Sequence, residues 1–428
     1  MSVELATRRR PGGLLWNRDF RLFWLGETTS NVGSAMAVVA MPLTAVAVLH
    51  ASTFVVGALQ ATAWLPWLLI GLPAGAWVDR LPKRRVMVAC DCVAFVLFGS
   101  VPIAAWTGVL TTAQLVVVAL LAGSVKVFFS NAYSPYLRTV VTAEHRPEAN
   151  AKLQGSASAA QLVGPGLGGL AAELLGAVSG LAANALSFAY SALCLMRIRA
   201  VEQPPARADG PRTALRAEIA EGLRFVARDP YLRVMVAFAG AGNFGDAIME
   251  SVVVVYLVRT VGVNAGVAGG LVAAMSVGGV TGAMISGRVA RRFGNARGLL
   301  LCQITGSPFM LLLALTTKGA GVVFFLAGGI IYLTGTVAAN VMIATFIQTY
   351  VPESILGRVT ATESLIGYGT LPLGALTGAL VGEAYGPRTA IWVSAIVITI
   401  SACILLAGPL RHRRNLPATS APMQEQQE

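Results

Sequence analysis

The chain has 428 residues, of which 55% are hydrophobic and 12% charged, and its formal net charge is +12. Soluble domains carry about 25% charged residues, so this composition excludes an ordinary soluble protein and is typical of a protein embedded in a bilayer. The Lys and Arg residues lie in short clusters between apolar segments, which argues against nucleic acid as a partner. The five cysteines lack the spacing of a disulfide framework or a metal site, so we expect no metal and no cofactor.

Apolar segments long enough to cross a bilayer, which takes about 20 residues, follow one another along the chain. The first is much longer than the apolar core of a signal peptide, so we interpret it as a membrane span. Six segments precede a polar stretch at 199–231, and six follow it. They lie near 21–48, 53–78, 86–107, 111–137, 151–175, 178–197, 233–259, 264–287, 297–316, 320–349, 358–382 and 388–410.

This order predicts an all-α polytopic membrane protein with twelve transmembrane helices in two six-helix bundles. The expected parts are a bundle at 1–198, a cytoplasmic linker at 199–232, a second bundle at 233–410 and a polar cytoplasmic tail at 411–428. In the linker, the apolar residues from Leu215 to Val226 recur at helical spacing, which predicts a short amphipathic helix on the membrane surface. A solvated linker helix is the alternative.

Nearly all Lys and Arg residues lie on one side of the membrane when both termini are placed in the cytoplasm. The exceptions are three residues in outer loops and one inside a span: Arg259, Lys318, Arg388 and Lys126. Because cytoplasmic loops are enriched in Lys and Arg, the sequence predicts a multi-pass protein of the cell membrane with both termini in the cytoplasm.

The two halves of the chain contain the same short motifs at a nearly constant separation. Three pairs match, at offsets of 212, 212 and 210 residues: 31–34 with 243–246, 75–85 with 287–297, and 141–144 with 351–353. A similar offset at three distant places predicts a duplicated six-helix unit, with the two copies related by an axis along the membrane normal.

Four stretches of the sequence carry a family resemblance. The loop GAWVDRLPKRR resembles the signature that the major facilitator superfamily carries between spans 2 and 3, and GPGLGG at 164–169 is similar to the glycine-proline motif of its exporters. FRLFWLGETTSNVGSAM and PESILGRVTATESL resemble the branch of enterobactin-exporter-type and multidrug efflux proteins. The resemblance covers nearly the whole chain. It implies a monomer that exports small molecules in exchange for protons.

The loop between spans 2 and 3 carries a candidate gate made of Gly75, Asp79, Arg80, Lys83, Arg84 and Arg85. By the family pattern, Asp79 meets the N-terminus of span 11 near Arg358 in the outward-open state, where free N–H groups and the helix dipole attract an anion. The alternative is a positive-inside anchor without a gating role, but an anchor needs no aspartate. The second copy has Arg291 at the acid position, so we expect this contact in one half only.

Polar and ionisable side chains inside the spans indicate function, because burying an unpaired charge in a bilayer is costly. Two sets share a helix face by their spacing: Asn243, Asp246 and Glu250 in span 7, and Glu27, Asn31 and Ser34 in span 1. We expect the two faces to meet across a central cavity. Since burial favours the protonated carboxyl group, Asp246, Glu250 and then Glu27 are candidates for carrying a coupling proton. The alternative is that these acids only pair with Lys126 or Arg259.

Further residues are candidates for lining the cavity or shaping the spans. Lys126 is expected to neutralise Asp246 or Glu250, or to contact an anionic substrate, and Asp91 is its alternative partner. The aromatic candidates for a pocket, each of which could equally serve helix packing, are Trp64, Trp67, Tyr133, Tyr332 and Tyr368. The glycine pairs that permit close helix contact, sliding or static, are Gly164/Gly168, Gly278/Gly282 and Gly374/Gly378. Pro165 removes one backbone hydrogen bond, which favours a bend in span 5.

No nucleotide-binding motif of the form GxxxxGK[ST] occurs in the sequence, and the loops are too short for an ATPase domain. We therefore expect a non-enzymatic, proton-coupled exporter of small amphipathic molecules, such as drugs or siderophores. The alternatives are a facilitator or importer of a polar solute, and a receptor or scaffold without flux. Few hydrogen-bonding side chains lie within the spans, which favours an apolar cargo.

Overall fold

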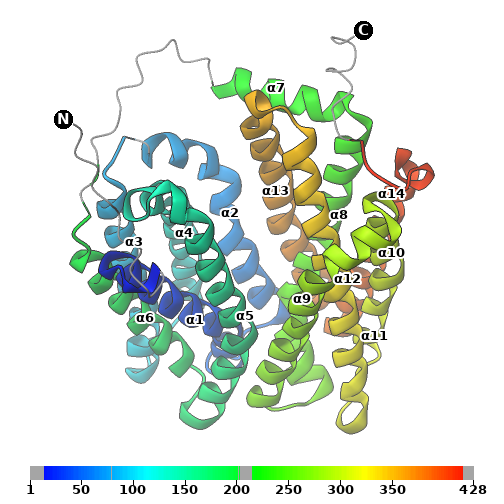
Figure 1. Ribbon diagram of the computed structural model, residues 1–428. Helices are drawn as coiled ribbons and strands as arrows, with labels where there is room; N and C mark the ends of the chain where they lie inside the picture. Colours follow the sequence, from blue (N-terminus) through cyan, green and yellow to red (C-terminus); the bar gives the residue numbers. More distant parts are fainter. Residues whose placement is uncertain (1–13, 79, 201, 203–214, 418–428) are drawn as a thin grey trace, which may run out of the picture.

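The computed structural model describes residues 14–78, 80–200, 202 and 215–417. Long helices dominate it (Figure 1). The α-helices are α1 (Arg18–Ala47), α2 (Thr53–Val78), α3 (Lys83–Trp106), α4 (Thr112–Val140), α5 (Arg146–Leu175), α6 (Ser179–Arg197), α7 (Leu215–Arg228), α8 (Pro230–Val255), α9 (Ala265–Phe293), α10 (Asn295–Gly306), α11 (Leu311–Ala314), α12 (Val322–Tyr350), α13 (Glu353–Tyr385) and α14 (Pro387–Ala407). Short helical turns flank them: η1 (Leu14–Trp16), η2 (Ala143–His145), η3 (Tyr256–Val261), η4 (Ser307–Met310), η5 (Gly319–Gly321) and η6 (Pro409–His412).

Within the described residues, 10 helical rods are long and apolar enough to cross a membrane. They are α1, α2, α3, α4, α6, α9, α12, α13, α14 and the rod formed by α10, η4 and α11. α5 and α8 have similar lengths and lie among these rods (Figure 1), so the architecture is consistent with the twelve expected crossings. The rod at 295–314 is irregular at Ser307-Pro308 because proline lacks the N–H that continues an α-helix.

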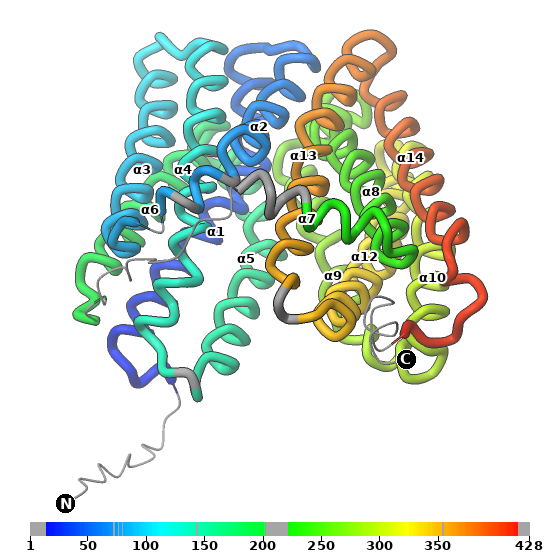
Figure 2. The backbone as a smooth tube through the Cα atoms, turned by 90° about the horizontal axis from the view of Figure 1, so that it is seen from above, coloured from blue at the N-terminus to red at the C-terminus, as the bar shows by residue number. Residues whose placement is uncertain are grey.

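The helices form two bundles, here called the first half (α1–α6) and the second half (α8–α14), as Figures 1 and 2 show. The sequence repeat reappears in their packing. α1 approaches α6 at Gly33, where a Cβ would overlap the side chain of Ser187, and α8 approaches α14 at Gly245, where a Cβ would lie 2.6 Å from a side-chain atom of Ile398. Gly33 and Gly245 are equivalent positions of the repeat. The expected all-α architecture of two related bundles is thereby confirmed.

The two halves meet along two pairs of helices, α2 with α13 and α5 with α9. The halves approach each other closely at Gly57 with Ala379 and at Gly169 with Gly269, where an added Cβ would overlap the facing helix. These positions lie near the starts of α2 and α9, at the end of the molecule opposite to α7. Toward α7 the two halves lean apart in Figure 1. We call these two ends the closed end and the α7 end.

α7 is the helix that the apolar spacing in the linker predicts. Glu221 on α7 forms an ion pair with Arg358 near the start of α13, with 2.7 Å between Oε1 and Nη1. Gly222 lies against the same turn of α13, and Val226 is buried in a cluster of second-half residues. This part of the apolar face of α7 therefore covers protein, and the position of the helix on the membrane surface stays a prediction.

Candidate functional site

A cavity of about 320 Å³ lies among the helices of the first half, at the junction with the second. α1, α2, α3, α4 and α6 supply its walls, and Glu250 on α8 is the lining residue that comes from the second half. Of the residues predicted to line a cavity or carry a proton, those that line it are Glu27, Asn31, Ser34, Trp64, Trp67, Lys126 and Glu250. Most of the other walls are Ala, Val, Leu, Met and Phe side chains, so the cavity is an apolar chamber with a few charged groups.

Lys126 on α4 and Glu250 on α8 attract each other across the junction between the halves. Gln60 on α2 lines the same cavity as Glu250. The Lys126 ammonium also lies 5.5 Å from the centroid of the Trp64 ring, a distance that permits a cation–π contact. Of the partners expected for Lys126, Glu250 lines the same cavity, so these two opposite charges face one chamber from different halves.

A second polar cluster, formed by Glu27, Asp91 and Asn184, lies in the wall of the cavity. Glu27 and Asp91 are 6% and 1% exposed, and Asn184 is 0% exposed. Among the described residues, Glu27 Oε1, Asp91 Oδ2 and both polar side-chain atoms of Asn184 have no hydrogen-bond partner. The two carboxyl groups repel each other when both are charged. An apolar site with two close carboxyl groups is suited to holding a proton or a cation.

Asp91 has different neighbours from those that the sequence predicts. The sequence suggested it as an alternative partner of Lys126, but the structure places it beside Glu27 and Ser191. The sequence does mark Asp91 as a candidate functional residue, because an acid within an apolar span indicates a functional site by default. Spacing could not pair it with Glu27, since the two residues come from different helices.

The expectation that the whole polar face of α8 looks into the cavity is wrong. Asp246 accepts a 2.6 Å hydrogen bond from the Tyr332 hydroxyl of α12, and Asn243 donates its side-chain amide to the carbonyl of Gly367 on α13, at 3.3 Å. The side chains of Asn243, Asp246 and Glu250 point in different directions from α8, and each has different neighbours. Glu250 alone of these three lines the cavity.

The predicted aromatic residues divide between the cavity and the packed interior. Trp64 and Trp67 line the cavity, and Tyr368 on α13 contacts both rings, with centroid distances of 6.1 and 4.8 Å. These contacts join the two halves beside the chamber. Tyr133 packs on Phe23 within the first half, whereas Tyr332 is buried in the second half beside Asp246. For these last two, the packing alternative describes their position.

The glycine-proline motif of α5 faces both halves. Gly164 and Gly168 lie against α1, where a Cβ would overlap the backbone or side chains of that helix. Gly169 lies against Gly269 of α9 in the second half: a Cβ added to Gly169 would lie 2.9 Å from the Cα of Gly269. The carbonyl of Pro165 also lies close to Gly269. α5 remains helical through Pro165. One short motif therefore serves packing inside the first half and close contact between the halves.

The other glycine pairs contact helices of their own half. Gly278 and Gly282 of α9 lie against α12, and Gly374 and Gly378 of α13 lie against α8. They permit close packing inside the second half and do not lie on the surface along which the halves would slide.

The candidate gate between α2 and α3 is described in part. Asp79 lies outside the described residues, so its contact with the start of α13 stays a prediction. Arg80 and Arg85 are exposed, as expected of residues that anchor a loop in water. Arg84 connects the start of α3 to the end of α6, because its guanidinium donates a 2.8 Å hydrogen bond to the carbonyl of Leu195. Gly75 faces the side chain of Asn131 on α4.

Matches to known proteins extend over nearly the whole chain. A family model described as transmembrane secretion effector, of the major facilitator superfamily, matches residues 14–428. The multidrug efflux pump Tap of Mycolicibacterium fortuitum is 26% identical over 401 residues, which cover 90% of this chain and 93% of that protein. Multidrug resistance protein 1 of Bacillus subtilis is 25% identical over 272 residues, which cover 62% of this chain and 65% of that protein.

Solved transporter structures share the fold. The nucleoside transporter NupG matches with a TM-score of 0.74 at 11% identity, covering 91% of this chain and 98% of that one. A bacterial homologue of the iron transporter ferroportin in an inward-facing state matches with a TM-score of 0.73 at 14% identity, covering 92% and 99%. At such low identity the likeness concerns the fold alone.

Proposed function

Because the chain belongs to the transmembrane secretion effector family of the major facilitator superfamily, we propose that this transporter is a proton-coupled exporter of small amphipathic molecules, such as drugs or secreted metabolites. The cavity carries the proposal: its walls are largely apolar and aromatic, and its few charged groups are of the kind that bind a proton or a charged cargo. The similarity to Tap, a protein named as a multidrug efflux pump, supports export as the direction.

The distribution of Lys and Arg supports placing the α7 end in the cytoplasm. With this orientation the halves contact each other on the outer side and lean apart on the cytoplasmic side, so the molecule is in an inward-facing conformation. An amphipathic cargo then reaches the cavity from the cytoplasm or the inner leaflet. Rocking of residues 1–198 against 233–410 opens the outer side and releases it.

Glu250 is our first candidate for the coupling group. Its carboxylate attracts Lys126 of the other half, and a proton on Glu250 ends that attraction. Protonation therefore changes a contact between the halves, which is what coupling requires of a proton site. Glu27 is the second candidate, together with its neighbour Asp91. Asp246 remains a candidate for a further protonation step, on the same helix as Glu250.

Transport in liposomes tests the proposal. Purified protein is reconstituted, a pH gradient is imposed, and the movement of a fluorescent amphipathic dye is followed with and without the gradient. We expect gradient-dependent flux in the wild type and loss of its gradient dependence in Glu250→Gln, because glutamine carries no titratable charge. Glu148→Gln is the matched control, since Glu148 lies on α5 outside the lining of the cavity.

The outcomes separate the parts of the proposal. Gradient-dependent flux in Glu250→Gln would show that this residue is not the coupling group. If several chemically different dyes show no flux with wild-type protein, export of amphipathic molecules is the wrong function. A polar-solute facilitator or a receptor without flux would then be the better interpretation.

A further inference from the structure

Two carboxylates at the closed end reach from one half to the first turn of a helix in the other half. Glu173 on α5 accepts hydrogen bonds from the backbone N–H of Gly266 and from the side-chain amide of Asn264, each at 3.0 Å, at the start of α9. Glu383 on α13 accepts a 2.9 Å hydrogen bond from the backbone N–H of Phe54, at the start of α2. Each contact therefore joins the two halves.

The two contacts are equivalent under the internal repeat. Glu173 and Glu383 are 210 residues apart, and Phe54 and Gly266 are 212 apart, the same offsets that relate the repeated motifs. The same interaction is thus made twice in opposite directions. The first half supplies the acid to a helix of the second, and the second half supplies the acid to a helix of the first.

The chemistry of a helix N-terminus explains why an acid is suited to these positions. The first N–H groups of a helix have no partner within it, and the helix dipole makes this end attractive to an anion. A carboxylate there accepts a charge-assisted hydrogen bond, which is stronger than a bond between neutral groups. At Gly266 the absence of a side chain leaves room for the Glu173 carboxylate, which an added Cβ would displace.

We infer that Glu173 and Glu383 form a pair of latches that hold the two halves together at the closed end and so keep that side of the transporter shut. A rocking motion that separates the halves at this end breaks both latches together, since each one spans the junction. The inference relies on the proposed function for the statement that the closed end faces the outside. The latch itself depends only on the contacts between the halves.

Pulsed electron paramagnetic resonance tests the latches in the full-length protein, with its five cysteines replaced and spin labels placed on cysteines at Val109 and Lys318. Val109 precedes α4 in the first half and is 66% exposed, and Lys318 follows α11 in the second half and is also exposed. The distance between the labels reports opening at the closed end without any cargo or proton gradient.

Charge removal is expected to favour the open form. For exposed carboxylates at helix N-termini, we expect Glu173→Gln and Glu383→Gln each to raise the open-to-closed ratio about threefold, and the double variant about tenfold. The two effects should multiply because the latches involve different helices and share no partner. Glu173→Asp and Glu383→Asp keep the charge and should stay closer to wild type, which separates loss of charge from poor folding.

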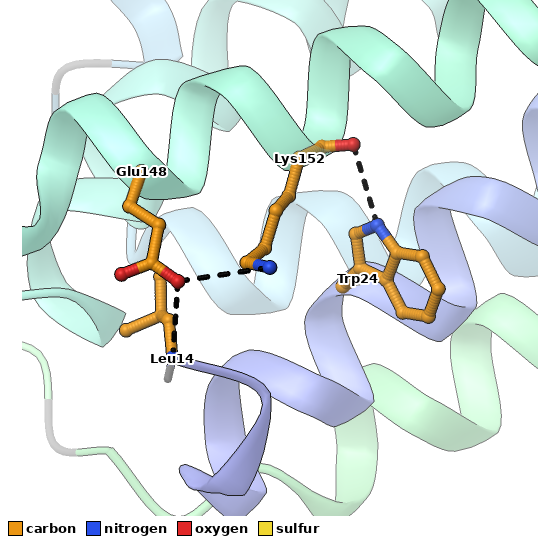
Figure 3. Close-up of polar contacts among 4 residues, drawn as sticks. All are labelled: Leu14, Trp24, Glu148 and Lys152. Carbon is orange, nitrogen blue, oxygen red and sulfur yellow. Dashed lines mark hydrogen bonds and ion pairs between the residues drawn. The ribbon is translucent and has the colours of Figure 1, made fainter. Parts of the chain in front are cut away.

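The matched control uses the same chemistry within one half (Figure 3). Glu148 of α5 accepts a hydrogen bond from the backbone N–H of Leu14 at 3.2 Å and pairs with Lys152 at 3.6 Å, and the carbonyl of Lys152 accepts from the Trp24 indole. All four residues belong to the first half or the turn before it. Glu148→Gln should therefore leave the distance between the labels unchanged.

A double variant with the same distance distribution as Glu148→Gln would overturn the latch. That result would leave the proposed export function standing, because the measurement contains no transport step. Conversely, increased opening of the double variant combined with a wild type that moves no dye would overturn the proposed function and leave the latch in place.

Discussion

The hydrogen bond between Tyr332 and Asp246 allows a quantitative test of what Asp246 does. The hydroxyl of Tyr332 lies 2.6 Å from Asp246 Oδ1 inside the second half, and Tyr332 is 2% exposed. Tyr332→Phe keeps the ring and removes the donor. A hydrogen bond to a charged group contributes about 1.5–3 kcal/mol to stability. We therefore expect the free energy of unfolding to fall by about 1.5–3 kcal/mol, with gradient-dependent transport close to that of the wild type.

A double-mutant cycle with Asp246→Asn isolates the contribution of this contact. Unfolding of the wild type, both single variants and the double variant is followed by denaturant titration in detergent. Because the two side chains bond directly, we expect a coupling energy of about 1 kcal/mol or more. Dye transport in liposomes is measured on the same four proteins.

The opposite pattern would refute this reasoning. If Tyr332→Phe leaves the free energy of unfolding unchanged but removes the dependence of transport on the proton gradient, the contact acts in the transport cycle. Asp246, rather than Glu250, would then be the first candidate for the coupling group.

Two further predictions concern the first half. Gly33→Ala should lower the free energy of unfolding by about 1–3 kcal/mol, because the added Cβ would overlap Ser187. Gly71→Ala is the control and should be tolerated, since nothing lies near its added Cβ. Thermal unfolding in detergent compares the two variants. For a cationic dye, Glu27→Gln combined with Asp91→Asn should raise the Kd about tenfold and leave the Kd of a neutral dye unchanged. Equal losses for both dyes would indicate that the pair shapes the cavity without providing a charge for the ligand.

The sequence predicted the arrangement of helices because lipid imposes simple rules on it. Apolar length defines the spans, and the repeat defines two related bundles. The packing of Gly33 and Gly245 at equivalent positions shows that the repeat survives as geometry. The break at Pro308 was not foreseen, because the apolar pattern of that span continues through it.

Side-chain directions were predicted less well than helices. Spacing shows that Asp246 and Glu250 lie near each other on α8, but the rotation of α8 depends on its contacts with α12 and α13. Those contacts turn Asp246 toward Tyr332 and leave Glu250 in the cavity. The neighbours Glu27 and Asp91 belong to different helices, and nothing in a one-dimensional pattern measures the distance between them.

The lining of the cavity by one half has a consequence for how such a protein evolves to transport a different cargo. Nearly all the wall residues belong to α1–α6, and the second half contributes Glu250. Under the proposed function, most residues that would contact the cargo and Glu250, the first candidate for the coupling group, thus lie in separate stretches of the chain. A chimera that joins this first half to the second half of a relative should keep the cargo range of this protein, provided that the relative has an acid where Glu250 stands. Substitutions that broaden or narrow the cargo range are accordingly expected to accumulate before residue 198, while the second half stays under a different constraint.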